Sequence, residues 1–212
     1  MAGRNVRQYL YTNLAGKPCV RKIRKEPKAF FMQSWVPGEH AFWAKGIRPE
    51  QEHFADRAMY HLPELMWALK AGEPVWWCEG EKDADAIRGV GGFATSHWQG
   101  AGAATRDQAK WFLRGNGRSL IRLVVDVDQS GCGANCVIVR KRLLLSAGVA
   151  RSRIRIVAPP LPHKDAAAAI EAGLPLSRFR RPDEARLTAA ANGYTAERKT
   201  RREFSDWMGR AS

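Results

Sequence analysis

From Pro74 to residue 173, short apolar runs alternate with segments of helical character, and this alternation constrains the fold more than any other feature. The runs read PVWWCE, GFATS, SLIRLVVD and RIRIVAP, and the helical segments read KDADAIRGV, TRDQAKWFLRG, ANCVIVRKRLLLSAG and KDAAAAIEAG. Strands that are separated by helices of this length pair in parallel, and the helices cover both faces of the sheet. The sequence therefore predicts an α/β domain built on a parallel sheet.

The segments on either side have different patterns. Residues 6–70 contain an alternating stretch, VRQYLYTNLAGKPCVRKIR, which turns at Asn13–Pro18 as a hairpin does, and further short strands in KAFFMQSWV and HAFWAKG. The helical run ADRAMYHLPELMWALKAG follows, and we expect Pro63 to divide it into two short helices. Beyond Leu174 the pattern favours one or two basic helices. We therefore expect a basic β-rich region over 1–72 that ends in a helix, an α/β domain over 73–173 and a basic helical tail over 174–212.

The charge is distributed unevenly along the chain, whose formal net charge is +14. Residues 1–70 carry 12 basic and 6 acidic groups, residues 71–130 carry 7 and 8, and residues 131–212 carry 16 and 7. Basic flanks of this kind are typical of proteins that bind polyanions, because each Lys or Arg on a phosphate releases a counterion.

Other features of the sequence argue against a membrane protein, a secreted protein and a zinc-binding protein. No apolar run approaches the roughly 20 residues that span a bilayer, and the N-terminus lacks the apolar core of a secretory signal. We therefore expect a cytoplasmic protein without membrane partners. The four cysteines do not form two closely spaced pairs, which favours reduced thiols over a structural zinc site.

Acidic residues follow three of the predicted strands. Glu79 follows the first strand, Asp126 and Asp128 follow the third, and Asp165 follows the fourth after a short linker. Because ligands bind at the carboxyl ends of parallel strands, we expect these four carboxylates to converge on one rim. Their mutual repulsion is relieved by a divalent cation, and hard oxygen ligands favour Mg²⁺ or Mn²⁺ over zinc. The sequence thus predicts a metal site made of these four residues.

Three motifs in this order resemble the TOPRIM domain. They are E79-G80-E81-K82-D83-A84 after one strand, D126-V127-D128-Q129-S130-G131 after another, and K164-D165 before the last helix. The resemblance covers about residues 74–173 and implies a Rossmann-like parallel sheet. TOPRIM domains occur in primases, topoisomerases, small nucleases and recombination proteins. The upstream stretches YLYTNLAGKPCVRKIRKEPKAFF and MYHLPELMWA look like the segment that precedes TOPRIM in phage and prophage primase-like proteins.

The resemblance assigns roles to individual residues. Glu79 matches the glutamate that acts as a general acid or base or assists metal binding, and Asp126 with Asp128 matches the metal-binding pair. Asp165 matches an acid that helps to hold a second metal in many primases, whereas Ala166–Ala169 stand where relatives often carry a further acid. The motif-supporting residues are Gly80, Asp83 and Gly131. We expect Glu81 and Asp85 to face solvent.

The function that the resemblance implies is that of a phage-type DNA primase, which joins ribonucleoside triphosphates on single-stranded DNA with Mg²⁺ or Mn²⁺. The residues expected to contact nucleic acid or nucleotide are Arg21, Lys22, Arg24, Lys25, Lys28, Lys82 and Lys164. Nearby aromatic residues, Phe30, Phe31, Trp35 and Trp43, are either core residues or stacking partners for bases.

Two alternatives remain open at this stage. The same carboxylates also suit a metal-dependent TOPRIM nuclease, and a non-catalytic DNA-binding accessory protein of replication fits the charge pattern. The sequence contains no G-x-x-x-x-G-K-[ST] phosphate loop, so we expect a replicative helicase to be a separate partner.

Overall fold

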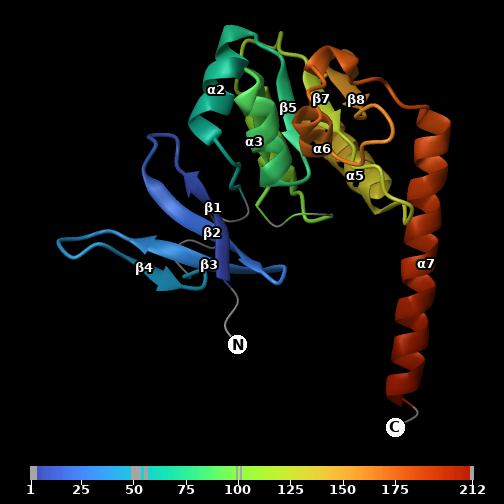
Figure 1. Cartoon of the computed structure of the whole chain (residues 1–212), viewed down its shortest axis with the longest axis horizontal. Coiled ribbons are helices and arrows are strands. Elements are labelled where there is room, and N and C mark those ends of the chain that lie inside the picture. Colours follow the sequence, from blue (N-terminus) through green and yellow to red (C-terminus); the bar gives the residue numbers. More distant parts are fainter. Residues whose placement is uncertain (1–3, 49–53, 55–56, 99, 101, 211–212) are drawn as a thin grey trace.

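The structure is a computed structural model that describes residues 4–48, 54, 57–98, 100 and 102–210 (Figure 1). Two four-stranded sheets organise these residues, an antiparallel sheet followed by a parallel one. The antiparallel sheet is a meander of β1 (Arg4–Thr12), β2 (Pro18–Glu26), β3 (Ala29–Val36) and β4 (Phe42–Lys45). The predicted hairpin turn is the connection between β1 and β2, where the amide of Asn13 donates to the carbonyl of Lys17 at 3.0 Å.

The parallel sheet has the strand order β6-β5-β7-β8, so β5 and β7 are its central strands. Its strands are β5 (Val75–Cys78), β6 (Phe93–Ser96), β7 (Ile121–Val124) and β8 (Ile154–Val157). Each strand lies within one of the four apolar runs. The predicted α/β fold with a β-rich N-terminal region is therefore confirmed.

Helices cover both faces of the parallel sheet (Figure 1). The described helices are α2 (Leu62–Ala71), α3 (Glu81–Gly89), α4 (Arg106–Lys110), α5 (Cys132–Ala147), α6 (Ala166–Glu171) and α7 (Glu184–Arg210). Helices α3 and α6 pack on one face, and α2, α4, α5 and α7 contribute to the core on the other. None of these described helices has both the length and the apolar character that crossing a membrane requires.

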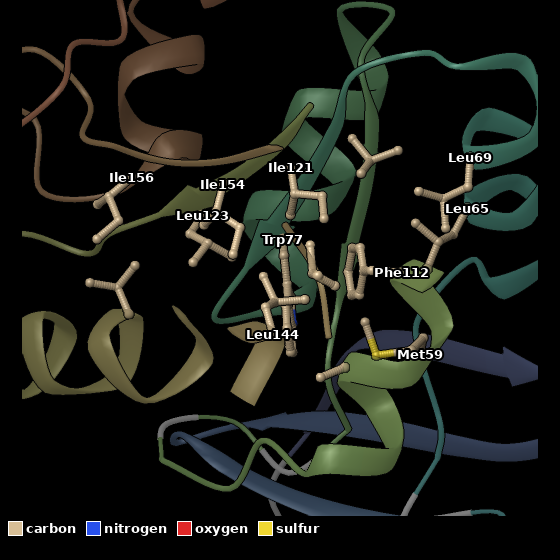
Figure 2. Close-up of a cluster of buried hydrophobic side chains, with 14 of the residues drawn as sticks. Met59, Leu65, Leu69, Trp77, Phe112, Ile121, Leu123, Leu144, Ile154 and Ile156 are labelled. Atoms are coloured by element: carbon tan, nitrogen blue, oxygen red, sulfur yellow. The ribbon is translucent and has the colours of Figure 1, made fainter. Parts of the chain in front are cut away.

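Trp77 of β5 lies at the centre of the larger core (Figure 2). Its indole stacks on Phe112, with ring centroids 4.9 Å apart and an interplanar angle of 22°. Its Nε1 donates to Nδ1 of the buried His97 at 3.3 Å. Leu65 and Leu69 of α2 pack in the same cluster, and fully burying a leucine contributes about 1.5–3 kcal/mol. Helix α2, which the sequence analysis grouped with residues 1–72, is thus packed on the parallel sheet.

The structure differs from the sequence prediction around Pro63. Instead of dividing two helices, Pro63 lies in the first turn of α2, where its missing N–H has no intrahelical acceptor to lose. Residues 57–61, immediately before the helix, form turns and one β-bridge at Met59. The helix ends at Gly72, whose φ of 83° suits a left-handed cap.

One face of the antiparallel sheet contacts the α/β domain through aromatic rings and a buried ion pair. Tyr11 of β1 packs against Tyr60 and Trp98, with ring centroids 5.5 Å and 5.3 Å away. The Nζ of Lys22 in β2 lies 2.5 Å from Oε1 of Glu81, and the Tyr11 hydroxyl donates to the same oxygen at 2.6 Å. Lys22 and Glu81 are only 6% and 5% exposed, so the expectation that Glu81 faces solvent is wrong. Glu81 instead joins the first turn of α3 to the N-terminal sheet.

The buried ion pair between Lys22 and Glu81 leads to a prediction about the free energy of unfolding. Lys22→Met leaves a buried carboxylate without its cation and Glu81→Leu leaves a buried ammonium without its anion, so each variant should lose about 3–5 kcal/mol of unfolding free energy. The double variant removes both charges and should lose much less than the sum of the two. Urea denaturation of all three variants measures this coupling.

Lys82→Met is the matched control, because Lys82 of the same helix forms a 3.4 Å ion pair with Glu171 at the exposed surface. It should change the unfolding free energy by less than about 1 kcal/mol. Strictly additive losses in the Lys22 and Glu81 variants would contradict the buried coupling.

Candidate active site

Glu79 stands directly after β5, one of the two central strands. Gly80 then caps α3 with an extended backbone at φ −124°, and a Cβ at this position would meet only Asp83 at 3.8 Å. Nothing in the structure therefore requires glycine at position 80. The Oε2 atom of Glu79 is buried and has no hydrogen-bond partner among the described residues. A buried carboxylate oxygen without a partner is costly, so its presence calls for a ligand.

Asp126 follows the other central strand, β7. Its Oδ1 atom is also buried and without a hydrogen-bond partner among the described residues. Burial, followed by the nearby carboxylates of Asp83, Glu79 and Asp165, raises the pKa of Asp126 to about 8, although the buried Arg140 opposes this rise. A carboxyl group with such a pKa holds its proton at neutral pH unless a cation takes the place of that proton.

Asp128 is held by the first turn of α5. Its Oδ1 accepts hydrogen bonds from the Ser130 hydroxyl at 2.5 Å and the Cys132 amide at 3.1 Å, and its Oδ2 accepts from the Gly133 amide at 2.6 Å. Burial pushes the pKa of Asp128 upward, but these hydrogen bonds outweigh burial and leave the pKa below its ordinary value. Asp128 therefore stays ionised when Asp126 is protonated.

Two glycines allow α5 to begin this close to the strand end. Gly131 has a φ of 78°, as expected for a tight turn, and a Cβ there would lie 2.5 Å from the carbonyl oxygen of Ala190 in α7. At Gly133 a Cβ would lie 2.0 Å from the carbonyl oxygen of Asp126. The first turn of α5 consequently rests on the backbone that carries Asp126.

Asp165 and Asp83 both hold the start of α6. Asp165 caps the helix by accepting from the amide of Ala168 at 2.7 Å, and Asp83 of α3 accepts from the amide of Ala167 at 2.9 Å. Burial raises the pKa of Asp83 to about 6, and the Ala167 hydrogen bond only partly offsets this effect. Asp83 thus ties α3 to α6. The alanines at 166, 167 and 169 are fully buried, so this run is part of the core beside the site.

A backbone hydrogen bond joins the second and third motifs. The amide of Val127 donates to the carbonyl of Lys164 at 2.6 Å. Together the segments enclose a hollow of about 250 Å³. Its lining residues are Glu79, Asp126, Val127, Asp128, Cys132, Gly133, Lys164 and Asp165. The structure thus brings the four carboxylates named from the sequence to one hollow at the carboxyl ends of the strands.

The donor atoms in the hollow suit a hard divalent cation. Within the described part of the chain, no three acidic, histidine or cysteine side chains already converge on one metal position. Mg²⁺ commonly uses only one or two carboxylates and takes its other ligands from water and substrate phosphates. The unpartnered oxygens of Glu79 and Asp126 fit that use, with Asp128 and Asp165 beside them.

The basic residues named from the sequence lie in different places. Lys164 lines the hollow, whereas Lys82 pairs with Glu171 and is not among the lining residues. Side chains along β2 alternate between the two faces of the sheet. Arg21 and Lys25 therefore lie on one face, and Lys22 and Arg24 lie on the other. Lys28 is exposed in the β2–β3 turn.

The structure contradicts the role that the sequence predicted for Lys22. We expected it to contact nucleic acid, but its ammonium is buried against Glu81. The alternation of side chains along β2 places Lys22 on the opposite face of the sheet from its neighbours Arg21 and Ile23, and this signal was present in the sequence. Its acidic partner, however, lies 59 residues away in the sequence. No role was expected from the sequence for Arg140, which is fully buried on α5 and interacts electrostatically with Glu79 and Asp126. Its spacing of four from Cys136 and Leu144, both buried, was the available signal.

The raised pKa of Asp126 predicts a pH-dependent stability in the absence of metal. Between its ordinary value of 3.8 and about 8, the folded chain keeps a proton that the unfolded chain releases. The unfolding free energy therefore falls by up to about 1.4 kcal/mol per pH unit as pH rises through this window. Asp126→Asn carries no such proton, so in EDTA its stability relative to the wild type should increase from about pH 5 to about pH 8.

Thermal unfolding across this pH range measures the effect. Asp107→Asn is the control, because a hydrogen bond from Lys110 lowers the pKa of the exposed Asp107. Asp107 is therefore ionised in both the folded and the unfolded chain from about pH 5 to about pH 8. Its stability difference should not change with pH. A pH-independent difference for Asp126→Asn would show that this carboxyl titrates normally.

No family model and no curated protein matches the sequence. Solved structures do match the fold. The primase fragment of the bacteriophage T7 primase-helicase protein aligns with a TM-score of 0.51 at 18% identity over 78% of this chain and 58% of that chain. The E. coli primase catalytic core aligns with a TM-score of 0.54 at 16% identity over 78% of this chain and 47% of that one.

A third match is the DnaG primase catalytic domain bound to single-stranded DNA, with a TM-score of 0.50 at 16% identity over 85% of this chain and 57% of that chain. The chain spans about half the length of these structures, from 47% to 58%. At these identities the likeness concerns the fold. The four-stranded parallel sheet with flanking helices and the preceding antiparallel sheet give this chain the TOPRIM fold of primase catalytic cores.

Proposed function

We propose that this chain is a primase-like nucleotidyltransferase that joins ribonucleotides on single-stranded DNA in a reaction dependent on Mg²⁺ or Mn²⁺. The observation that carries the proposal is the pair of buried, unpartnered carboxylate oxygens, Glu79 Oε2 and Asp126 Oδ1, at the carboxyl ends of adjacent parallel strands. The fold that the chain shares with primase catalytic cores supports it.

The four carboxylates have distinct parts in this proposal. Glu79 and Asp126 offer the oxygens that bind the cation, while Asp128 and Asp165 bring further negative charge from positions fixed by helix starts. When bound, the cation would lower the pKa of the primer 3′-hydroxyl, which attacks the α-phosphorus, and would neutralise charge on the triphosphate as pyrophosphate leaves. Glu79 either accepts the proton of that hydroxyl or completes the metal shell, and both roles use its buried Oε2.

Lys164 supplies the positive charge of the hollow. It stands next to Asp165, and its backbone carbonyl is fixed by the Val127 amide at 2.6 Å. An exposed ammonium at this rim can pair with a triphosphate oxygen without being desolvated by the protein. We therefore assign the nucleotide phosphates to the side of the hollow that carries Lys164.

We assign the template to the face of the N-terminal sheet that points away from the α/β domain. The Arg21 guanidinium lies 4.4 Å from the ring centroid of Trp43, and the Lys25 ammonium lies 4.8 Å from that of Phe31. Trp35 and Trp43 are neighbours with centroids 5.0 Å apart. Cations interleaved with aromatic rings suit single-stranded nucleic acid, because the cations pair with phosphates and the rings stack on bases.

The catalytic proposal is tested by primer synthesis. Wild-type protein with single-stranded DNA, Mg²⁺ or Mn²⁺ and labelled ribonucleotides should make short RNA, and Asp126→Ala/Asp128→Ala should reduce the rate by at least about 100-fold, because the site loses its metal-binding pair. Asp107→Ala is the control, since this aspartate is exposed on α4 and pairs with Lys110. Product length and yield are read on a denaturing gel.

The other outcomes identify the alternatives. Shortened DNA without RNA products would point to a nuclease that uses the same carboxylates. DNA binding without either reaction would point to an accessory protein. Full activity in the double variant would mean that the reaction takes place elsewhere in the molecule.

The template face is tested by the salt dependence of binding. Arg21→Ala/Lys25→Ala should weaken the binding of a fluorescent single-stranded oligonucleotide and reduce the log–log salt slope by about 1.4, because each phosphate contact on single strands contributes about 0.7. The control is Arg118→Ala/Arg151→Ala, which removes two exposed arginines that precede β7 and β8. Anisotropy titrations at several salt concentrations measure both slopes, and equal slopes for the two variants would refute the assignment of the template to this face.

A further inference from the structure

Arg140 is a buried cation that the mechanism above does not use. It lies on α5 with no exposed surface, and burial lowers the pKa of its guanidinium although Glu79 and Asp126 oppose that effect. An arginine remains charged even so, since its ordinary pKa is far above neutrality. Burying such a charge is costly unless its donors are satisfied and an opposite charge is near. The position of Arg140 therefore needs an explanation.

The hydrogen bonds of Arg140 connect the two strands that carry the unpartnered carboxylates. Its Nη1 donates to the carbonyl of Trp77 at 2.6 Å, and its Nη2 donates to the carbonyl of Val124 at 2.8 Å. Trp77 stands two residues before Glu79, and Val124 stands two residues before Asp126. One rigid guanidinium thus joins the ends of β5 and β7.

The electrostatic setting of Arg140 points in the same direction. The groups that influence its charge are the carboxylates of Glu79 and Asp126 and the thiols of Cys78 and Cys136. Neutral His97, whose pKa burial lowers to about 3, adds no competing charge. Arg140 therefore opposes the mutual repulsion of these two carboxylates from a fully buried position.

We propose that Arg140 is a positioning residue for the metal site, which holds Glu79 and Asp126 at the separation at which both can bind one divalent cation. The inference rests on the proposed metal-dependent function. The proposed role requires the planar guanidinium of arginine and not only its positive charge. A lysine can supply the charge but cannot hold two carbonyls in a fixed geometry.

The test measures Mn²⁺ binding to the full chain by electron paramagnetic resonance or calorimetry, so that it does not depend on catalysis. Arg140→Lys and Arg140→Met should bind Mn²⁺ about 10–100-fold more weakly than the wild type, as is typical when a partner that orients metal ligands is lost. Arg142→Met is the matched control, because Arg142 is exposed on the same helix, and it should bind like the wild type. Circular dichroism and thermal unfolding without metal establish that each variant is folded.

A second readout separates positioning from general destabilisation. In primer synthesis, folded Arg140→Lys should require about 10–100-fold more Mg²⁺ for half-maximal rate and should recover most of the rate at saturating Mg²⁺. A variant that is merely unstable would instead lose rate at all Mg²⁺ concentrations.

Three outcomes overturn the inference. Folded Arg140→Lys or Arg140→Met could bind Mn²⁺ as tightly as the wild type, or the wild type could show no Mn²⁺ binding that depends on Asp126. The third outcome is that Arg140→Lys fails to fold. The last result would assign Arg140 to the stability of the core alone. Failure of the proposed function gives a different pattern. If the wild type binds Mn²⁺ through Asp126 and Arg140→Lys weakens that binding, but no RNA is made, the positioning role stands and the primase activity does not.

Discussion

The repulsion between two partly buried carboxylates, Glu79 and Asp126, is the constraint on which the rest of the site depends. Parallel pairing of β5 with β7 places both residues at the same edge of the sheet, and the Oε2 and Oδ1 atoms that find no protein partner lie there. Burial first, and then the carboxylates of Asp83 and Glu79, raise the pKa of Asp126 to about 8, so this arrangement is unfavourable in the absence of a ligand. The proposed divalent cation would relieve the repulsion by binding between the two groups.

The surrounding structure keeps this arrangement in place. Helix α5 rests on the Asp126 backbone through Gly133, and Asp83 connects α3 to the start of α6. The buried pair of Lys22 and Glu81 fixes the N-terminal sheet to the first turn of α3, only two residues beyond Glu79. Stability and the proposed function are therefore coupled, because the ion pair that joins the N-terminal sheet to α3 lies two residues from a proposed catalytic residue.

Much of this architecture follows from local sequence, and the exceptions are contacts between distant segments. The four strands and the acids that follow them were predictable, because apolar runs and strand-end positions are local signals. The burial of Lys22 was not, since its partner Glu81 lies 59 residues away. Arg140 had a helical-spacing signal, but its acceptors, the carbonyls of Trp77 and Val124, become neighbours only when β5 and β7 pair. The role of Pro63 depended on where α2 begins, which local propensity leaves undecided by a few residues.

The most direct test of the central claim is a crystal structure of the protein soaked in Mn²⁺, with anomalous scattering used to locate the ion. We predict an anomalous peak in the hollow, within coordination distance of Glu79 and Asp126, and loss of this peak in Asp126→Ala. A hollow without a peak, or a peak confined to the neighbouring thiols of Cys132 and Cys136, whose sulfur atoms are 4.0 Å apart, would contradict the account.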